Sequence, residues 1–149
     1  MPATHEDDGE RQRIAEAVRD RMLADDRASR ALGIEITAIG PGRATAMMTV
    51  RADMLNGFAL CHGGLITTLA DSAFAFACNS HNELTVASGI SIDIMVPGRE
   101  GDVLTANAEE VSRAGRTGVY DVEVRNQRGE RVAVFRGRSY TVKGKRVVE

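Results

Sequence analysis

The run from residue 65 to residue 78 constrains this chain most, because only one of its side chains is charged. Ten of the fourteen residues are apolar, and no polar stripe recurs at helical spacing. A helix that is apolar nearly all round is normally surrounded by other parts of the protein. The sequence therefore predicts a long buried helix over residues 63–80, around which the rest of the fold is arranged.

The single charge in this run, Asp71, and the glycines before it point to chemistry. A carboxylate in apolar surroundings costs free energy unless it is hydrogen-bonded or has a chemical task. Gly63 and Gly64 leave backbone N–H groups exposed at the helix start, where they favour an oxygen with negative charge. An acid and an oxyanion-binding helix start within ten residues are the two parts that an acyl-transfer site needs.

Strand patterns flank the buried helix on both sides. Two precede it, at residues 34–39 and 43–51, and four follow it, at 90–94, 104–109, 119–125 and 131–142. Alternating apolar and polar residues are typical of strands with one buried face. Short turns favour antiparallel pairing of neighbouring strands. Such a sheet encloses one helix only by curling around it, and its open edges predict pairing with a second copy, hence a homo-oligomer.

Two helical segments are expected before the first strand. Residues 10–25 have an amphipathic pattern with Asp7 or Asp8 as the expected cap, and Thr4 and Asp7 form a weak capping box. Residues 27–32 form a second short piece, ended by Gly33. The expected organisation is an N-terminal helical segment over residues 1–26, one domain over 27–143, and a frayed C-terminal tail over 144–149.

Length, charge and cysteine content exclude several classes of protein. The 149 residues suit one domain. No 18-residue apolar segment is present, and the polar N-terminus is unlike a secretory signal. A cytoplasmic location is therefore expected. The two cysteines and three histidines show no metal-ligand spacing, which favours reduced thiols and no metal site. Residues 112–149 carry ten basic and four acidic side chains, which suits either a small polyanion such as a nucleotide phosphate or a solvated basic face. No recognisable module predicts a duplex nucleic acid as partner.

A series of short motifs runs through residues 25–143. The pattern Asn-x5-His-Gly-Gly-x6-Asp begins at Asn56 and ends at Asp71. The further matching segments are residues 54–57, 61–64, 69–71, 73–80, 97–98, 101–102, 117–121 and 135–137. Together they resemble the hotdog-fold acyl-CoA thioesterases, and within them the phenylacetic-acid-degradation subfamily, the hydroxyphenylacetyl-CoA thioesterases.

The resemblance implies an α+β hotdog fold, a curved antiparallel sheet of five to six strands wrapped around one long apolar helix, with an N-terminal helix. It implies a dimer whose two sheets join, doubled to a homotetramer, with active sites at the dimer interface. By resemblance, the Gly63 amide polarises the thioester carbonyl, and Asp71 acts from the partner subunit as general base or nucleophile. Asn56 and His62 match loop residues that orient the carbonyl or the water. Residues 58–60 are more apolar than the resemblance leads us to expect.

Each candidate residue also has a plainer interpretation. Asp71 could be a structural acid bonded to the backbone or to a nearby hydroxyl, from Thr67, Thr68 or Ser72. The two glycines could serve only tight backbone geometry, which is the favoured role for Gly64. Asn56 could form a turn before Gly57, and His62 could be an ordinary loop histidine. A Cys61–His62 nucleophile is disfavoured, because adjacent side chains in an extended loop point apart.

The best candidates for binding the phosphates of coenzyme A are Arg113 and Arg116, in the turn over residues 112–117. Guanidinium groups bind phosphate through paired hydrogen bonds, although a solvated hairpin tip would have the same composition. Ser88, Gly89 and Arg138 are weaker candidates for contact with the substrate.

The sequence thus predicts an enzyme that hydrolyses aryl-acetyl-CoA thioesters, phenylacetyl-CoA or hydroxyphenylacetyl-CoA, to the free acid and CoA in phenylacetate catabolism. No cofactor is expected, because CoA is part of the substrate. One alternative is a hotdog-fold hydratase or dehydratase that acts on acyl thioesters with a His and an acid. The other is a non-catalytic acyl-CoA sensor, which the fold alone does not distinguish from an enzyme.

Overall fold

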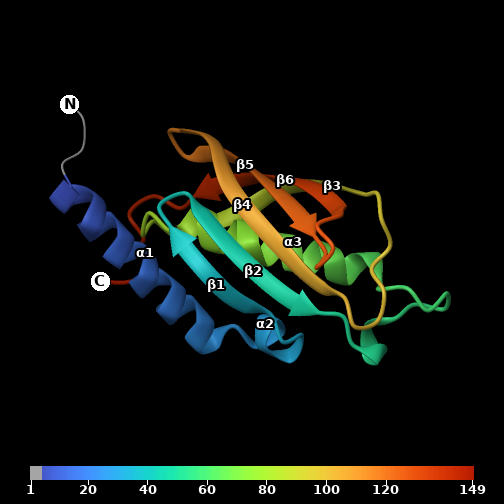
Figure 1. Ribbon diagram of the computed structural model, residues 1–149. Coiled ribbons are helices and arrows are strands. Elements are labelled where there is room, and N and C mark those ends of the chain that lie inside the picture. The colour runs from blue at the N-terminus through green and yellow to red at the C-terminus, as the bar shows by residue number, and fades with distance from the viewer. Residues whose placement is uncertain (1–4) are drawn as a thin grey trace.

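The computed structural model describes residues 5–149, which form a six-stranded antiparallel sheet packed against a central helix (Figure 1). Helices α1 (His5–Asp25) and α2 (Arg27–Ala31) come first, followed by β1 (Glu35–Gly40), β2 (Arg43–Thr49) and the short 3-10 helix η1 (Ala52–Met54). The central helix α3 (Gly63–Asn79) leads into β3 (Thr85–Ile94), β4 (Val103–Ala114), β5 (Thr117–Arg125) and β6 (Arg131–Thr141). The predicted order of two strands, one long helix and four strands is confirmed.

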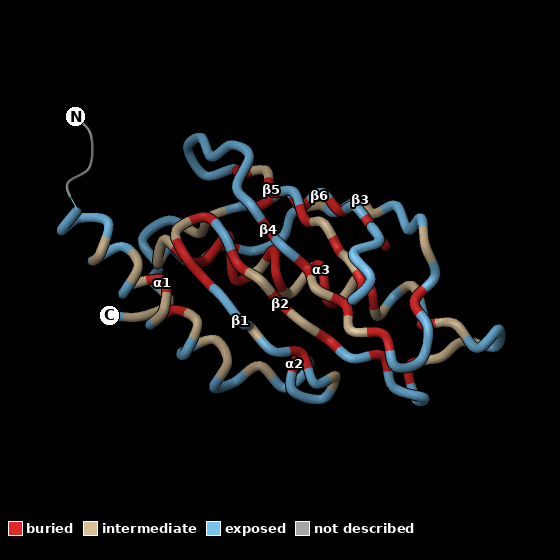
Figure 2. Tube along the Cα trace, in the orientation of Figure 1, coloured by how far each residue is buried: buried red, intermediate tan, exposed pale blue. Residues whose placement is uncertain are grey.

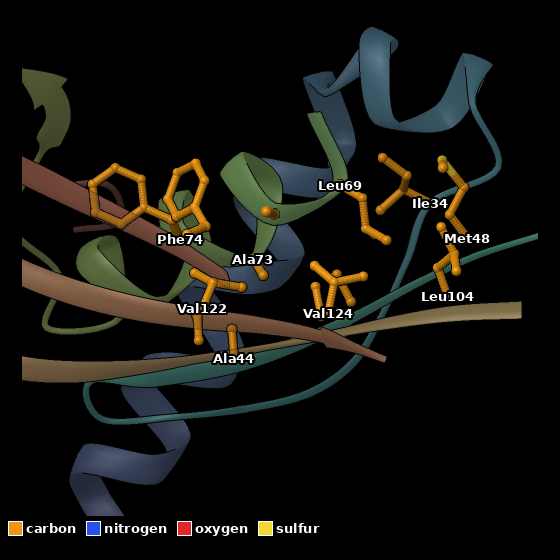
Figure 3. Packing of buried hydrophobic residues seen from close by; sticks show 14 of the residues in the cluster. Ile34, Ala44, Met48, Leu69, Ala73, Phe74, Leu104, Val122 and Val124 are labelled. Atoms are coloured by element: carbon orange, nitrogen blue, oxygen red, sulfur yellow. The ribbon is translucent and has the colours of Figure 1, made fainter. Parts of the chain in front are cut away.

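Helix α3 lies at the centre of the hydrophobic core, as its composition predicts. Leu69, Ala73 and Phe74 on α3 are buried against the inner faces of the strands (Figure 3). The facing side chains are small or medium aliphatic residues, Ala44 and Met48 from β2, Leu104 from β4, and Val122 and Val124 from β5. Buried positions therefore recur every second residue along β2 and β5, and Figure 2 shows them along the strands and on α3.

The strand order is β1-β2-β4-β5-β6-β3, which differs in part from pairing between sequence neighbours. Pairs β1–β2, β4–β5 and β5–β6 join consecutive strands, as expected. However, β2 pairs with β4, and β3 pairs with β6. The prediction of neighbour pairing is wrong at these two places, because α3 and the segment of residues 95–102 carry the chain from one side of the sheet to the other.

Strand β3 forms one edge of the sheet and leaves apolar side chains open. Ile90 and Ile94 are 42% and 43% exposed, and Met95, which follows the strand, is 48% exposed. Only Ile92 of the alternating isoleucines packs against the core, as a partly buried residue. An edge strand with apolar side chains is a surface suited to pairing with another chain.

The ends of the chain differ from the sequence-based expectation. Helix α1 already includes His5, so Asp7 and Asp8 lie in its first turn and the prediction that either is the cap is wrong; Thr4 lies outside the described residues. The cap of α2 is Asp26, whose side chain accepts a hydrogen bond from the Ser29 N–H. The tail is not frayed, because the Asn82 side chain accepts hydrogen bonds from the N–H groups of Val147 and Val148.

No helix among residues 5–149 has the length and apolarity needed to cross a membrane.

Candidate active site

The loop before α3 is closed by hydrogen bonds around Asn56. Leu55 and Cys61 form an antiparallel bridge, and the Asn56 N–H donates to the Leu60 carbonyl at 2.7 Å. The Asn56 Oδ1 accepts from the N–H groups of Phe58 and Leu60, at 2.9 and 3.2 Å. Asn56 therefore has the turn-forming role that was one of its two interpretations. Its Nδ2 has no hydrogen-bond partner within residues 5–149, so it remains able to donate to a ligand.

This loop is fixed to the body of the protein at both of its ends. The Cys61 N–H donates to the Gly98 carbonyl at 2.7 Å, and the His62 N–H donates to the Met54 carbonyl at 2.8 Å. A Cβ at Gly98 would lie 2.9 Å from the Cys61 Cβ, so only glycine allows this approach. The match at residues 97–98 thus has a structural reason, which is to place the start of α3.

His62 is the N-cap of α3. Its Nδ1 accepts a hydrogen bond from the Gly64 N–H at 3.1 Å. An imidazole nitrogen that accepts is unprotonated, so the neutral ring carries its hydrogen on Nε2 and can donate from there. The Gly64 amide is thereby satisfied inside the protein, which agrees with a structural role for Gly64.

The Gly63 N–H, in contrast, has no acceptor in the described part of the chain. It lies at the first position of α3, where the helix dipole favours negative charge. A Cβ on Gly63 would come 3.2 Å from the Ile94 Cδ1 at the end of β3. The structure therefore leaves one open amide at this helix start, and it is the amide to which the resemblance gives the carbonyl oxygen as a prediction.

Asp71 lies two turns further along α3 and is partly buried. Across residues 5–149 its side chain has no hydrogen-bond partner, and burial raises the pKa of its carboxyl group. The hydroxyls that offered a structural explanation bond elsewhere, Thr67 to the Gly63 carbonyl, Thr68 to the Gly64 carbonyl and Ser72 to Ser29. A partly desolvated carboxylate without a partner is suited to accept a proton.

Gly63 and Asp71 of one chain are too far apart to act on one carbonyl group. Eight residues of α-helix separate them by about 12 Å along the axis. The first N–H groups of a helix also point away from the helix body, so a bound oxygen lies further still from Asp71. A site that uses both residues must therefore combine Gly63 of one chain with Asp71 of another.

The candidates for binding CoA lie at the opposite end of the domain. Ser88 is six residues before Ile94 on β3, about 20 Å along the strand from the start of α3. Its Oγ donates to the Arg138 carbonyl, and the Arg138 side chain lies against Gly89, where a Cβ would be 3.1 Å from Nε. Ser88 and Arg138 line a groove of about 270 Å³ beside the β4–β5 turn.

The two arginines of that turn face different partners. Arg113 forms ion pairs with Glu83 and Glu110, at 3.4 and 3.7 Å, which leaves less of its charge for a ligand. Arg116 donates to the Tyr140 hydroxyl at 3.3 Å. Arg116 also lines a second groove, of about 630 Å³, to which the C-terminal tail contributes three further cations, Lys143, Lys145 and Arg146. The candidates predicted from the sequence did not include these three cations, although the excess of basic residues over 112–149 indicated a binding surface for a polyanion.

Both cysteines are free and buried. Burial raises the pKa of the Cys61 thiol, and it raises the pKa of Cys78 to about 12, so both are neutral thiols near pH 7. The Cys61 Sγ donates to the backbone carbonyl of His62, away from the imidazole ring. The geometry thus gives no support to a Cys–His nucleophile.

Among residues 5–149, no three His, Cys, Asp or Glu side chains gather as a metal site would require.

Comparison with known proteins fits this geometry. The profile of the Thioesterase superfamily matches residues 58–133. Acyl-coenzyme A thioesterase PaaI of Escherichia coli is 48% identical over 123 residues, which cover 83% of this chain and 88% of PaaI. The chain belongs to the thioesterase superfamily. This membership confirms two predictions from the sequence, the hotdog fold and the assignment of the chain as a thioesterase.

Solved structures of similar proteins agree in architecture. The E. coli PaaI protein, from the phenylacetic acid degradation operon, superposes with a TM-score of 0.88 at 45% identity, covering 90% of this chain and 97% of PaaI. A Streptococcus mutans protein that was solved bound to acetyl-CoA superposes with a TM-score of 0.72 at 28% identity, covering 76% and 90% of the two chains.

Proposed function

We propose that this thioesterase hydrolyses aryl-acetyl-CoA thioesters, phenylacetyl-CoA or a ring-hydroxylated relative, to the free acid and CoA. The observation that carries the proposal is that α3 has an open Gly63 amide at its start and, further along, a partly buried Asp71 with no hydrogen-bond partner among the described residues. The E. coli relative comes from the phenylacetic acid degradation operon, which supports a role in phenylacetate catabolism. The similar S. mutans protein was solved bound to acetyl-CoA, which supports a CoA ester as substrate.

The active unit of this proposal contains two copies of the chain, with Gly63 from one and Asp71 from the other. The separation of about 12 Å along the helix requires this arrangement if both residues act on one carbonyl group. The exposed Ile90 and Ile94 on the β3 edge support an interface there, because Ile94 also lies beside Gly63. Two such dimers form a homotetramer in the proposed assembly, and the proposed location is the cytoplasm.

In the proposed reaction the thioester oxygen accepts a hydrogen bond from the Gly63 N–H. Asp71 takes a proton from a water molecule as the water oxygen bonds to the carbonyl carbon, and negative charge moves to the oxygen at Gly63. The tetrahedral intermediate then collapses, the C–S bond breaks, and the CoA sulfur receives the proton from Asp71. Direct attack by Asp71, through a mixed anhydride, is the second route; the partner-free carboxylate favours water activation, because a raised pKa strengthens a base.

Two loop residues and the far grooves complete the proposed site. The Nε2–H of His62 and the Nδ2 of Asn56 are the open donors that would orient the carbonyl or the water. The phosphates of CoA are assigned to Arg116 and Arg113, with Ser88, Gly89 and Gly64 lining the path of the substrate. No metal or redox cofactor takes part in these steps.

Replacement of Asp71 by asparagine tests the proposal. D71N should lower kcat for phenylacetyl-CoA by about 10²- to 10⁴-fold, the range for loss of a positioned base, with the circular dichroism spectrum unchanged. The matched control is D20N, which changes an exposed carboxylate paired with Arg19 on α1 and should leave kcat unchanged.

Thiol release from a series of aryl and straight-chain acyl-CoAs measures the activity. Wild-type turnover in D71N would refute the assignment of Asp71. Tight binding of acyl-CoA by the wild type without thiol release would identify a sensor instead. A change in enoyl-CoA absorbance without thiol release would identify a hydratase.

A further inference from the structure

A groove of about 630 Å³ begins where α3 ends, and four cations line it. Its walls come from α1, residues 81–83, the β4–β5 turn and the C-terminal tail, which Figure 1 shows beside α1. The cations are Arg116 from the turn and Lys143, Lys145 and Arg146 from the tail. Positive side chains from two segments far apart in the sequence thus surround one concavity of the size of a small-molecule site.

The acidic side chains at this groove are engaged by other residues. Glu83 is the only acidic residue among the described residues of the lining, and it forms an ion pair with Arg113 at 3.4 Å. His81, also in the lining, lies 2.9 Å from the carboxylate of Glu110. Within residues 5–149, none of the four cations forms an ion pair with an acidic side chain. The groove therefore has a positive potential that the fold itself does not neutralise, and this potential favours a bound anion.

Hydrogen bonds fix the backbone that carries the three tail cations. The Val142 N–H donates to the Leu84 carbonyl at 2.8 Å, and the Leu84 N–H donates to the Lys145 carbonyl at 3.0 Å. The Asn82 side chain bonds to the backbone of residues 147–148. The tail is thus held on both sides of the cations, so a ligand has to order only their side chains, which lowers the entropic cost of binding.

The chemistry of the lining favours phosphate groups over a nucleobase or a nucleic acid. Guanidinium groups bind phosphate through paired hydrogen bonds, and lysine ammonium groups bind it as compact charges. A chain of phosphates concentrates several negative charges in a small volume, which suits several cations around one groove. Among the described residues of the lining, none is Phe, Tyr or Trp, so no such ring is present to stack on a base. The net charge of −2 argues against a duplex nucleic acid.

We infer that this groove binds a polyphosphate group through Arg116, Lys143, Lys145 and Arg146, and that it recognises the phosphates and not the group attached to them. Two sources offer this chemistry, the diphosphate of coenzyme A in the substrate and a separate nucleotide or pyrophosphate. The first source rests on the proposed function, whereas the second is independent of it.

Calorimetric titration with pyrophosphate, ATP and CoA tests the inference. Loss of one charge about 4 Å from a phosphate weakens binding by about 5-fold, so K143Q/K145Q should raise the Kd of each ligand by about 10- to 30-fold. The matched control is R27Q/R30Q, which removes two exposed positive charges from α2 and should bind like the wild type. Citrate, an anion without phosphate, should bind at least about 10-fold more weakly than pyrophosphate.

A second measurement uses the unaltered protein. Lys143 and Lys145 are the only lysines in the sequence, so acetylation of lysine ε-amines reports on this groove alone. Pyrophosphate should slow the acetylation of both lysines, as followed by mass spectrometry of the peptide that contains them. Equal rates with and without pyrophosphate would place the bound phosphates elsewhere and overturn the inference.

The kinetics of K143Q/K145Q distinguish the two sources. A KM for phenylacetyl-CoA that rises together with the Kd for CoA, at unchanged kcat, assigns the phosphates to the substrate. An unchanged KM with weakened pyrophosphate binding assigns the groove to a separate nucleotide or pyrophosphate.

Three results overturn the inference, namely a wild type that binds none of the three polyphosphates, unchanged binding in K143Q/K145Q, and citrate that binds as tightly as pyrophosphate. The proposed function fails separately, because a wild type that releases no thiol from acyl-CoAs overturns it and leaves the binding of pyrophosphate unaffected.

Discussion

Replacement of Gly63 by proline removes the amide hydrogen that the proposed mechanism assigns to the carbonyl oxygen of the substrate. Gly63 is the first residue of α3, the helical position at which proline is best tolerated. The preceding residue, His62, has φ −57° and ψ 128°, which lies in the region that a residue before proline prefers. Because the Gly63 N–H has no acceptor within residues 5–149, its loss removes no hydrogen bond from the described fold.

The structure separates the catalytic cost of this change from its structural cost. Loss of one oxyanion donor typically lowers kcat by about 10²- to 10³-fold, equivalent to about 2.7–4 kcal/mol of barrier. For folding, a Cβ at this position meets the Ile94 Cδ1 at 3.2 Å, a contact that G63A and G63P share. Replacement of glycine in a compatible conformation stabilises by about 0.4–1 kcal/mol, which for a chain of this size shifts Tm by at most about 4 °C.

The assay is thiol release from phenylacetyl-CoA by the wild type, G63A and G63P, with Tm measured for each. We expect G63A to retain the larger part of kcat and G63P to fall at least about 100-fold below G63A, at similar Tm. If G63P folds and remains within about 10-fold of G63A, the Gly63 amide is not the oxyanion donor and the reasoning fails.

Two further predictions concern the other residues of the site. Burial raises the pKa of Asp71 in the folded state above its ordinary value of 3.8, so ionisation of Asp71 destabilises the fold at pH above the folded-state pKa and has no effect at pH below the unfolded-state pKa. D71N should therefore raise Tm at pH 7–8, and this gain should disappear toward pH 3. A gain in Tm that is equal at pH 3 and pH 8 would contradict this reasoning. Since His62 caps α3 through the Gly64 N–H, H62A should destabilise by about 1 kcal/mol and H62S should restore Tm. Activity that returns in H62S would show that His62 acts through the cap alone, whereas recovery of Tm without activity would show a separate role for Nε2.

The parts of the fold that follow from local patterns were predictable. Helix α3 spans Gly63–Asn79, one residue short of the predicted end, because an apolar run with glycines before it allows few other structures. The buried alternation of β2 follows directly from Ala44, Ala46 and Met48. In these segments the burial pattern and the intrinsic preferences of the residues agree.

Long-range pairing was not predictable in the same way. The alternating Ile90, Ile92 and Ile94 predict a strand with one buried face. In the described chain, however, the strand lies at an edge, and Ile90 and Ile94 are 42% and 43% exposed. Alternating apolar residues indicate that one face of the strand is covered, but they do not indicate what covers it. The same pattern is expected whether a second chain or the core of the same chain covers that face. The pairing of β3 with β6 depends on the path of residues 95–102, which no local signal specifies.

The site shows the same division between local and distant information. The sequence singled out Gly63, Gly64 and Asp71 together, but the bond from the Gly64 N–H to His62 is what separates an open amide from a satisfied one. The absence of a partner for Asp71 depends on where the Thr67, Thr68 and Ser72 hydroxyls point, which is fixed only by the folded helix. The tail cations next to Arg116 were missed because their position depends on Asn82, more than sixty residues away.

Because the proposed site takes residues from two chains, its activity is expected to depend on protein concentration. A monomer holds an open Gly63 amide and an Asp71 carboxylate that cannot meet, since the helix between them is rigid and about 12 Å long. Under conditions where the chains separate, the proposed site predicts that activity depends on the square of monomer concentration. If the proposed interface covers the exposed Ile90, Ile94 and Met95, separation of the chains returns their apolar area to water and is unfavourable. The same edge that assembles the sheet of a dimer would thereby assemble the catalytic pair, and stability of the interface and turnover should fall together.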